Sequence, residues 1–265
     1  MRLLFIGDIV GNKGTEAVVN NLALIKKEFR PQLTIANGEN STSVGRGISK
    51  NIYKELMGSG VDVITLGNHA WNNAEIVDFI DDATKLIRPA NFPGKDVPGK
   101  GYVVVNVNGI KVGIINLQGR IFLNNLDDPF TLADEIIDKL KAETDIIFVD
   151  FHAEATSEKL AFATYVTGRV SAVVGTHTHV QTNDARILNK YTAFLTDAGM
   201  SGPTDGILGM HADNIIQQFI NQRPTRFKVE ETGPTIISGC YIDVDNESGK
   251  AQKIKTFKVM NDQII

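Results

Sequence analysis

Short apolar runs alternate along the chain with stretches in which apolar residues recur at helical spacing. The runs are typical of buried strands, and the stretches are typical of helices that lie against a sheet. In the first third of the chain we predict strands at residues 3–6, 33–36 and 61–66 and helices at 16–29, 50–57 and 75–80. This alternating order favours a mainly parallel sheet with helices on its faces.

Two other stretches predict β-hairpins. Residues 102–107 and 111–117 flank Asn108-Gly109, a residue pair typical of a type I′ turn. Residues 235–244 and 251–259 flank a second polar turn near the end of the chain. Hairpins place antiparallel strands beside the parallel ones, so the sheets should be mixed.

Between the hairpins the chain returns to alternating strands and helices. We predict helices at 132–141 and 158–167 and strands at 146–151 and 172–174. Together with the hairpins, these elements indicate an α/β fold in which two mixed sheets pack together under covering helices. The chain shows no repeat, low-complexity tract or linker, so we expect residues 1–265 to form a single domain.

Composition narrows the class of protein. The formal charge of -4 predicts no broad basic surface of the kind that attracts nucleic acid. The single cysteine, Cys240, lies in an apolar run, which indicates a buried, inert thiol and fits a reducing cytoplasm. No apolar stretch approaches the roughly 20 residues that a membrane span needs. We therefore expect a cytoplasmic protein with no membrane partner, and the sequence leaves open whether it forms homo-oligomers.

Polar side chains that can bind metals follow five of the predicted strands. They are Asp8, Glu39, Asn68, His69, His152, His177 and His179. Taken singly, each has an ordinary alternative role in a turn, a helix cap or a hydrogen bond. In open α/β sheets, however, ligands bind at the carboxyl ends of the strands. Their convergence on one edge therefore predicts a functional site.

The types of side chain indicate the chemistry. His177 and His179 are two residues apart, so on extended backbone both imidazoles would point the same way, toward one metal cluster. Carboxylates, an amide oxygen and imidazoles without a thiolate favour iron, manganese or zinc. These ligands are too many for one tetrahedral zinc, and they suit two ions about 3.5–4 Å apart. The residues alone thus predict a two-metal hydrolase.

Five short motifs occur in the order found in one superfamily. They are Gly7-Asp8-Ile9-Val10, Gly38-Glu39-Asn40, Gly67-Asn68-His69, His152 and Gly175-Thr176-His177-Thr178-His179. Over residues 7–180 the chain thereby resembles the calcineurin-like metallophosphoesterases. It departs from their pattern at Val10, where a histidine is usual, and at Glu39, where an aspartate is usual. Ala70-Trp71 also follows His69 in place of an acid.

The same departures point to a particular branch of that superfamily. They occur with the strings Asn37-Gly38-Glu39-Asn40-Ser41, Gly45-Arg46-Gly47-Ile48 and Thr196-Asp197-Ala198-Gly199-Met200-Ser201-Gly202. With these strings, most of the chain resembles the bacterial YmdB-like phosphodiesterases. The resemblance implies a four-layer αββα sandwich with two mixed β-sheets and a centre of two iron or manganese ions. It also implies hydrolysis of small cyclic nucleotide phosphodiesters of the 2′,3′ or 3′,5′ kind.

The resemblance further implies a role for each ligand. Asp8 and His179 would hold the first ion, with Asn40 in the place left by Val10. The second ion would be held by Asn68, His152 and His177, and both ions by Glu39. Hydrolysis would proceed by attack of a hydroxide that bridges the ions. As a hypothesis, His69, which lies next to a ligand, would protonate the leaving alkoxide.

Three further residues have weaker indications. Arg46 lies in a Gly-flanked loop and is a candidate contact for a phosphate or a base, or else a solvated arginine. Trp71 is a candidate for stacking on a nucleobase, or else a core residue. His211, at the start of a predicted helix, is expected to be a cap or a surface residue.

Two other functions remain open at this stage. The same metals would serve a phosphomonoesterase or 5′-nucleotidase, which acts on a different leaving group. A slow-turnover, metal-dependent regulatory or scaffold protein is the alternative from another class. Because His69 is kept beside the ligands, the sequence favours an enzyme.

Overall fold

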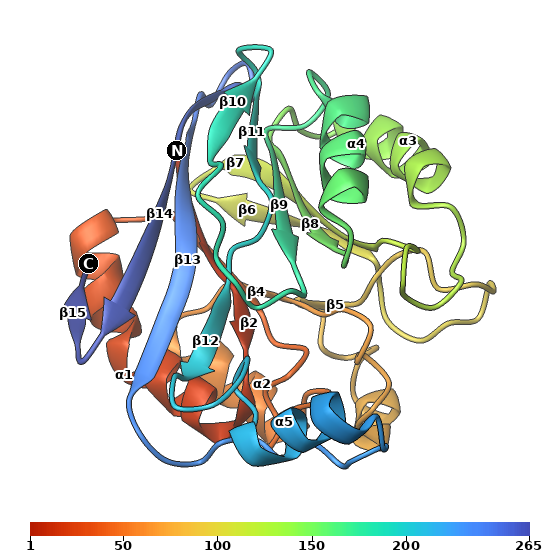
Figure 1. The fold of residues 1–265 in the computed structure, drawn as a ribbon. Helices are drawn as coiled ribbons and strands as arrows, with labels where there is room; N and C mark the ends of the chain where they lie inside the picture. Colours follow the sequence, from red (N-terminus) through yellow and green to blue (C-terminus); the bar gives the residue numbers. More distant parts are fainter.

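Two mixed β-sheets face each other in the computed structural model, which describes residues 1–265 (Figure 1). The first sheet contains β1 (Arg2–Ile6), β2 (Asp8–Ile9), β3 (Leu33–Asn37), β4 (Val63–Thr65), β5 (Leu86–Ile87), β12 (Met200–Pro203), β13 (Thr235–Val244), β14 (Ala251–Met260) and β15 (Gln263–Ile264). The second contains β6 (Tyr102–Val107), β7 (Ile110–Gln118), β8 (Ile147–His152), β9 (Ala172–Thr176), β10 (Arg186–Leu188) and β11 (Thr192–Leu195).

Each sheet combines parallel strands with antiparallel ones. In the first sheet the order is β15-β14-β13-β1-β3-β4-β5, in which β1, β3, β4 and β5 are parallel. In the second it is β10-β11-β9-β8-β7-β6, with β6 and β10 antiparallel at the edges. The carboxyl ends of β1, β3 and β4 therefore share one edge, as do those of β7, β8 and β9.

Helices cover the outer face of each sheet. Helices α1 (Gly11–Phe29) and α2 (Lys50–Ser59) lie on the first sheet, and α3 (Pro129–Lys141) and α4 (Thr156–Val166) lie on the second (Figure 1). A 3₁₀ helix, η1 (Ala74–Asp78), and a further helix, α5 (Ala212–Asn221), lie in connecting segments. The predicted four-layer αββα sandwich is confirmed. None of the helices combines the length and the hydropathy that crossing a membrane requires.

Alternation along the strands creates three apolar layers. In β1, Leu4 and Ile6 pack beneath α1, whereas Leu3 and Phe5 point into the space between the sheets. Phe5 meets Phe148 of β8 there, with ring centroids 5.2 Å apart. This two-residue period lets each strand contribute to two cores at once. Cys240 lies in the layer between the sheets, and its thiol is buried and free, as the sequence predicts.

Both predicted hairpins are present. Asn108 and Gly109 have φ values of 53° and 89°, and two positive values are the signature of the type I′ turn between β6 and β7. Strands β13 and β14 pair along almost their whole length, with a register shift at Asp243/Val244.

Several predicted boundaries are wrong. Helix α1 begins at Gly11 rather than residue 16, because its polar first turn carries no apolar periodicity and is held instead by Gly11 N–H donating to the carbonyl of Asn40, 2.8 Å away. The predicted helix at 75–80 is the 3₁₀ turn η1, whose first turn is capped by Asn73. Strands β2, β5, β10, β11, β12 and β15 were not predicted, because two to four residues are too few to show a period.

Candidate metal centre

The carboxyl ends of strands from both sheets meet at one edge of the sandwich, and the predicted ligands gather there. Asp8 follows β1, Glu39 follows β3 and Asn68 follows β4, while His152 ends β8 and His177 follows β9. Hydrogen-bond or ion-pair distances connect all seven predicted ligands into one cluster: Asp8, Glu39, Asn40, Asn68, His152, His177 and His179.

Three acceptor atoms converge on one nitrogen of His152. Its Nε2 lies 2.8 Å from Asn68 Oδ1, 3.0 Å from Glu39 Oε1 and 3.1 Å from His177 Nδ1. An imidazole nitrogen carries at most one proton, so it can satisfy one of these atoms and not all of them. Glu39, His152 and His177 each offer a ligand atom within 4.8 Å of the others. A divalent cation fits this arrangement of lone pairs better than a proton does.

The other half of the cluster is formed by Asp8, Asn40 and His179. Asp8 is fully buried, and its Oδ2 accepts from His177 N–H at 3.1 Å while its Oδ1 has no hydrogen-bond partner. A buried carboxylate oxygen without a partner is costly, and a bound cation would compensate for it. Asn40 Nδ2 lies 3.2 Å from both Glu39 Oε1 and His179 Nε2. A ligand role for Asn40 therefore requires its amide to turn so that the oxygen faces the cluster.

Each histidine of the cluster is oriented through its other ring nitrogen. His177 Nε2 lies 3.0 Å from Glu154 Oε2, and His179 Nδ1 lies 3.1 Å from the carbonyl of Leu208. Carboxylate and carbonyl oxygens only accept hydrogen bonds, so these ring nitrogens donate. The opposite nitrogens, His177 Nδ1 and His179 Nε2, are left as lone-pair donors that face the cluster. Such outer partners are typical of metal-binding histidines.

His152 is oriented by a relay that ends at a buried acid. Its Nδ1 lies 2.9 Å from Thr176 Oγ1, and that hydroxyl donates to Asp150 Oδ1 at 2.7 Å. Asp150 Oδ2 accepts from Asn37 Nδ2 at 2.9 Å and from the hydroxyl of Thr65. Burial raises the pKa of Asp150, whereas the neighbouring His152 works to lower it. Asp150 thus connects the ends of four strands beneath the cluster.

The backbone of the Gly175–His179 segment differs from the predicted extended form. Strand β9 ends at Thr176, and His177 and His179 have φ values of 98° and 62°. Their side chains consequently diverge, His177 toward His152 and His179 toward Asn40. A non-glycine residue in this region costs about 1–3 kcal/mol and persists only where its surroundings hold it. Here Asp197 holds the segment, because its Oδ2 accepts from Thr178 N–H at 3.1 Å and from its hydroxyl at 2.8 Å.

The cluster strongly perturbs its own protonation equilibria. Burial opposes the charge on His152, but Glu39 and then Asp8 outweigh it and raise the pKa of His152 to about 9. Burial also acts on Glu39, yet the adjacent His152 lowers the pKa of that carboxyl well below its usual range. For His177, burial and the charge on His152 lower the pKa to about 3, so its imidazole is neutral. Burial raises the pKa of Asp8 despite the histidines nearby.

Gly67 allows the cluster to close. A Cβ at this position would overlap Glu39 Oε2 and the imidazole of His152. Only glycine therefore lets the loop after β4 pass close enough for Asn68 to reach His152.

His69 lies beside the cluster. Its backbone N–H donates to Glu39 Oε2 at 3.0 Å, and its Nδ1 lies 3.0 Å from Asn72 Oδ1. Because the amide oxygen of Asn72 accepts, Nδ1 of His69 carries a proton and Nε2 is left without a hydrogen-bond partner. Arg46, in the loop that follows Glu39, is exposed and lines a pocket together with Asn72 and His211.

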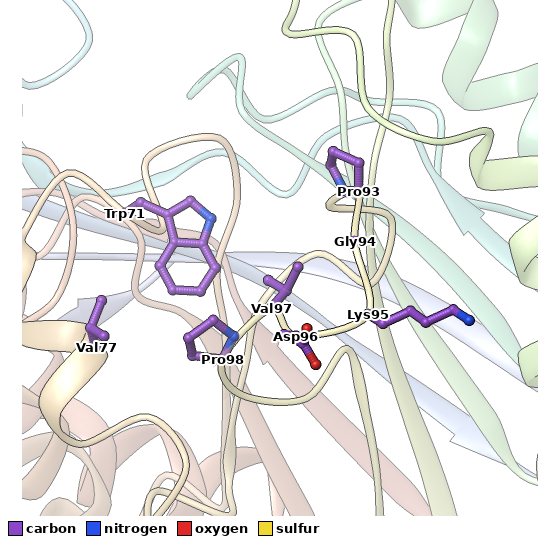
Figure 2. A pocket seen from close by; sticks show the side chains of 8 residues that line it. All are labelled: Trp71, Val77, Pro93, Gly94, Lys95, Asp96, Val97 and Pro98. Carbon is purple, nitrogen blue, oxygen red and sulfur yellow. The ribbon is translucent and has the colours of Figure 1, made fainter.

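Trp71 packs against the core and also borders a pocket, and its stacking on a nucleobase stays a prediction. Its ring meets Phe92 edge-on, with centroids 5.5 Å apart, and packs against the core beneath α1 and α2. Its remaining face lines an open pocket of about 540 Å³ together with Val77 and the loop at 93–98 (Figure 2). No hydrogen bond or aromatic contact links Trp71 to the cluster.

His211 occupies the position before α5 but makes no side-chain cap. Its half-exposed imidazole lies 3.7 Å from Glu230 Oε2. His211 is therefore a surface residue, which is one of the two roles expected from the sequence.

The sequence did not predict the roles of Glu154 and Asp150, or that Asp197 holds the segment that carries His177 and His179. An acid inside the apolar run 146–151 was a visible signal for Asp150. Asp197 belongs to one of the motifs shared with the YmdB-like branch, but the sequence assigned it no role. Nothing in the sequence marks Glu154, because its partner His177 comes from another strand.

A family model and a relative of known name point to the same family. A family model described as YmdB-like protein matches residues 4–257. A Bacillus subtilis protein named 2′,3′-cyclic-nucleotide 2′-phosphodiesterase is 53% identical over 264 residues, which is 100% of this chain and 99% of that protein.

Two solved structures have the same fold over nearly their whole length. A hypothetical protein from Thermus thermophilus has a TM-score of 0.91 and 38% identity, covering 98% of this chain and 99% of its own. A novel phosphatase from Mycoplasma pneumoniae has a TM-score of 0.92 and 34% identity, covering 98% of this chain and 93% of its own.

Proposed function

The chain belongs to the YmdB-like protein family, and we propose that it is a two-metal phosphodiesterase that hydrolyses 2′,3′-cyclic nucleotides. The resemblance found in the sequence is confirmed, and so is the prediction of a phosphoric ester hydrolase. The Bacillus subtilis relative carries the substrate class in its name. The number of ions, their identity and the individual ligand roles belong to the proposal.

The metal part of the proposal rests on acceptor atoms that outnumber the hydrogen-bond donors available to them. Three acceptors approach His152 Nε2, and Asp8 Oδ1 is buried without a hydrogen-bond partner. His152, Asn68 and His177 would hold one ion, because their free ligand atoms lie together. Asp8 and His179 would hold the other, with Asn40 in its turned form.

Glu39 would bridge the two ions. Its Oε1 lies 3.0 Å from His152 on one side and 3.2 Å from Asn40 on the other, so the carboxylate stands between the two halves. Nitrogen and oxygen ligands without a thiolate fit iron or manganese, with zinc as the third candidate. Two divalent ions carry four positive charges, of which Asp8 and Glu39 neutralise two. The site is then cationic inside an acidic protein and attracts an anionic phosphodiester.

Bound divalent ions would supply Lewis-acid charge and lower the pKa of a bound water to about 7, which would provide a nucleophile at neutral pH. The chain itself supplies the proton for the leaving group. Asn72 orients His69 through Nδ1, and the imidazolium form of His69 would give its second proton, on Nε2, to the departing ribose oxygen. General acids of this kind typically contribute about 10²–10⁴ in rate.

A substrate panel tests the proposal. Purified protein of measured metal content should hydrolyse 2′,3′-cyclic nucleotides faster than 3′,5′-cyclic nucleotides at equal concentration. Bis-p-nitrophenyl phosphate should be cleaved in preference to p-nitrophenyl phosphate. A preference for the monoester would instead identify a phosphomonoesterase.

A Glu39→Gln variant separates an enzyme from a regulatory scaffold. The amide keeps the size of the side chain but removes the bridging charge, so hydrolysis should fall to the background rate. Glu135→Gln, an exposed glutamate on α3, is the matched control and should keep full activity. Full turnover in Glu39→Gln would contradict the two-metal mechanism.

A further inference from the structure

A second cavity, of about 810 Å³, opens next to His69. We call it the side pocket. It is lined by the loop residues Ser43, Val44 and Arg46, by Asn72 and His211, and by residues 225–232. Asn72 belongs both to the side pocket and to the site, because its Oδ1 lies 3.0 Å from His69 Nδ1. The volume falls within the range of about 300–1,000 Å³ that is typical of small-molecule sites.

The wall of the side pocket is also tied to the opposite side of the metal centre. Leu208 accepts from His179 Nδ1 at 3.1 Å, and the residues after it pair with the wall through their backbones. His211 N–H donates to the carbonyl of Lys228 at 2.8 Å, and Glu230 N–H donates to that of Gly209 at 3.0 Å. The lining of the side pocket is therefore connected to the metal centre on two sides, through Asn72 to His69 and through Leu208 to His179.

Positive charges without partners line the side pocket. Arg46, Arg226 and Lys228 are exposed, and none of their charged groups makes an ion pair or a hydrogen bond. Of the two lining carboxylates, Glu230 is buried, bonded to Thr232 and 3.7 Å from His211. Glu231 alone is exposed. The side pocket thus has three unpaired cations and one exposed carboxylate, Glu231. This is a local excess of positive charge in a chain whose formal charge is -4.

We propose that the side pocket binds further phosphates of the substrate, so that this protein acts on oligonucleotides whose 3′ end carries a 2′,3′-cyclic phosphate. This inference rests on the proposed function and specifies that its substrate is longer than a mononucleotide. A cyclic mononucleotide has one negative charge, which the metal centre takes up. Its ribose and base are neutral and offer nothing to Arg46, Arg226 or Lys228.

The next phosphodiester along a chain supplies the missing charge. Arginine recognises phosphate through two parallel hydrogen bonds, and lysine does so as a point charge. Arg46 belongs to the loop after Glu39, whereas Arg226 and Lys228 belong to the segment 225–232. Cations from two separate segments of the lining suit a strand with more than one phosphate.

Kinetics on paired substrates test the inference. The wild-type protein is compared on a 2′,3′-cyclic mononucleotide and on a dinucleotide ending in the same cyclic phosphate. We expect the KM for the dinucleotide to be about tenfold lower, the worth of one charge-assisted hydrogen bond. In the double variant Arg226→Gln/Lys228→Gln the ratio of the two kcat/KM values should fall close to one. Arg223→Gln, an exposed cation outside the side pocket, should keep the wild-type ratio.

A binding measurement keeps this test separate from that of hydrolysis. Fluorescence anisotropy with a 5′-labelled dinucleotide 3′-phosphate should show tighter binding by the wild type than by the double variant, with a steeper loss of affinity in salt. If the wild type hydrolyses mononucleotide and dinucleotide with equal kcat/KM, or if the double variant binds as well as the wild type, the inference is overturned. If neither cyclic phosphate is hydrolysed but the difference in binding remains, the proposed function fails and the side pocket stands as an oligonucleotide site.

Discussion

Lys159 and Asp197 form an ion pair that solvent does not reach. Lys159 Nζ lies 2.7 Å from Asp197 Oδ2, and the two side chains are 1% and 0% exposed. The same Asp197 oxygen accepts two hydrogen bonds from Thr178, the residue between His177 and His179. Helix α4 is thereby connected through one carboxylate to the segment that carries two predicted metal ligands.

Lys159→Met should therefore affect both stability and the metal centre. The substitution leaves Asp197 buried without its counter-charge, and breaking a buried pair costs about 3–5 kcal/mol. Chemical denaturation of the metal-free protein should show this loss, and the remaining folded protein should bind Mn²⁺ more weakly. Lys111→Met, which removes an exposed pair with Glu143, should change the free energy of unfolding by about 1 kcal/mol or less. Equal effects of the two substitutions would contradict the bracing role of Lys159.

Gly67→Ala should remove metal binding while the fold persists. Its new Cβ would overlap Glu39 and His152, so the two side chains must separate. Metal analysis after dialysis against Mn²⁺ should find the variant depleted, with a far-UV circular dichroism spectrum like that of the wild type. Gly58→Ala is the matched control, since its Cβ would meet nothing within 4 Å in α2. That variant should bind metal normally and gain roughly 0.5–1 kcal/mol in stability.

Metal binding should release a proton from His152. A pKa of about 9 means that this imidazole is protonated in the neutral range, and a histidine ligand must be neutral. Affinity for Mn²⁺ should thus rise with pH and level off above about pH 9. Calorimetric titration at pH 7 in buffers of different ionisation enthalpy should report a released proton, and His152→Gln should abolish that release. Affinity that stays constant with pH would contradict this protonation of His152.

Glu154 is predicted to tune the ligand strength of His177. The carboxylate accepts from Nε2 and orients the ring, so Glu154→Ala should lower the affinity for metal about 10- to 100-fold. Glu154→Gln keeps an acceptor oxygen and should lie between the alanine variant and the wild type. Competition with a metal chelator measures the three affinities. An alanine variant with wild-type affinity would show that this contact is incidental.

The sequence predicted the site better than the parts that support it. Asp8, Glu39 and His152 were recognisable because each follows an apolar strand, and parallel strands bring their ends together. The layers were predictable because β1 and β8 are short, mainly apolar runs, which are typical of strands buried on both faces. The path of Gly175–His179 was predicted wrongly, because contacts of Thr178 with Asp197 override the extended form.

The supporting contacts were out of reach of pattern reasoning. Glu154 and Leu208 each act on a histidine from another part of the chain, so no local spacing reveals them. The wall of the side pocket at 225–232 has no periodicity either. Its role depends on where its backbone pairs with Gly209 and His211.

Loss of His69 should slow hydrolysis without removing the ions. His69→Ala should reduce kcat about 10²–10⁴-fold for a 2′,3′-cyclic nucleotide, whose ribose leaving group needs a proton. The reduction should be small for bis-p-nitrophenyl phosphate, because p-nitrophenolate leaves without one. Metal content should equal that of the wild type. An equal loss on both substrates would assign His69 to structure or binding instead of proton transfer.

The most direct test of the two-metal mechanism is the number of ions needed for hydrolysis. Metal-free protein is titrated with Mn²⁺ while the initial rate of 2′,3′-cyclic AMP hydrolysis is followed and bound metal is measured. We predict negligible activity without metal and a rate that rises until two ions are bound per chain, then stays constant. Full activity at one ion per chain, or activity in protein shown to be free of metal, would contradict the mechanism.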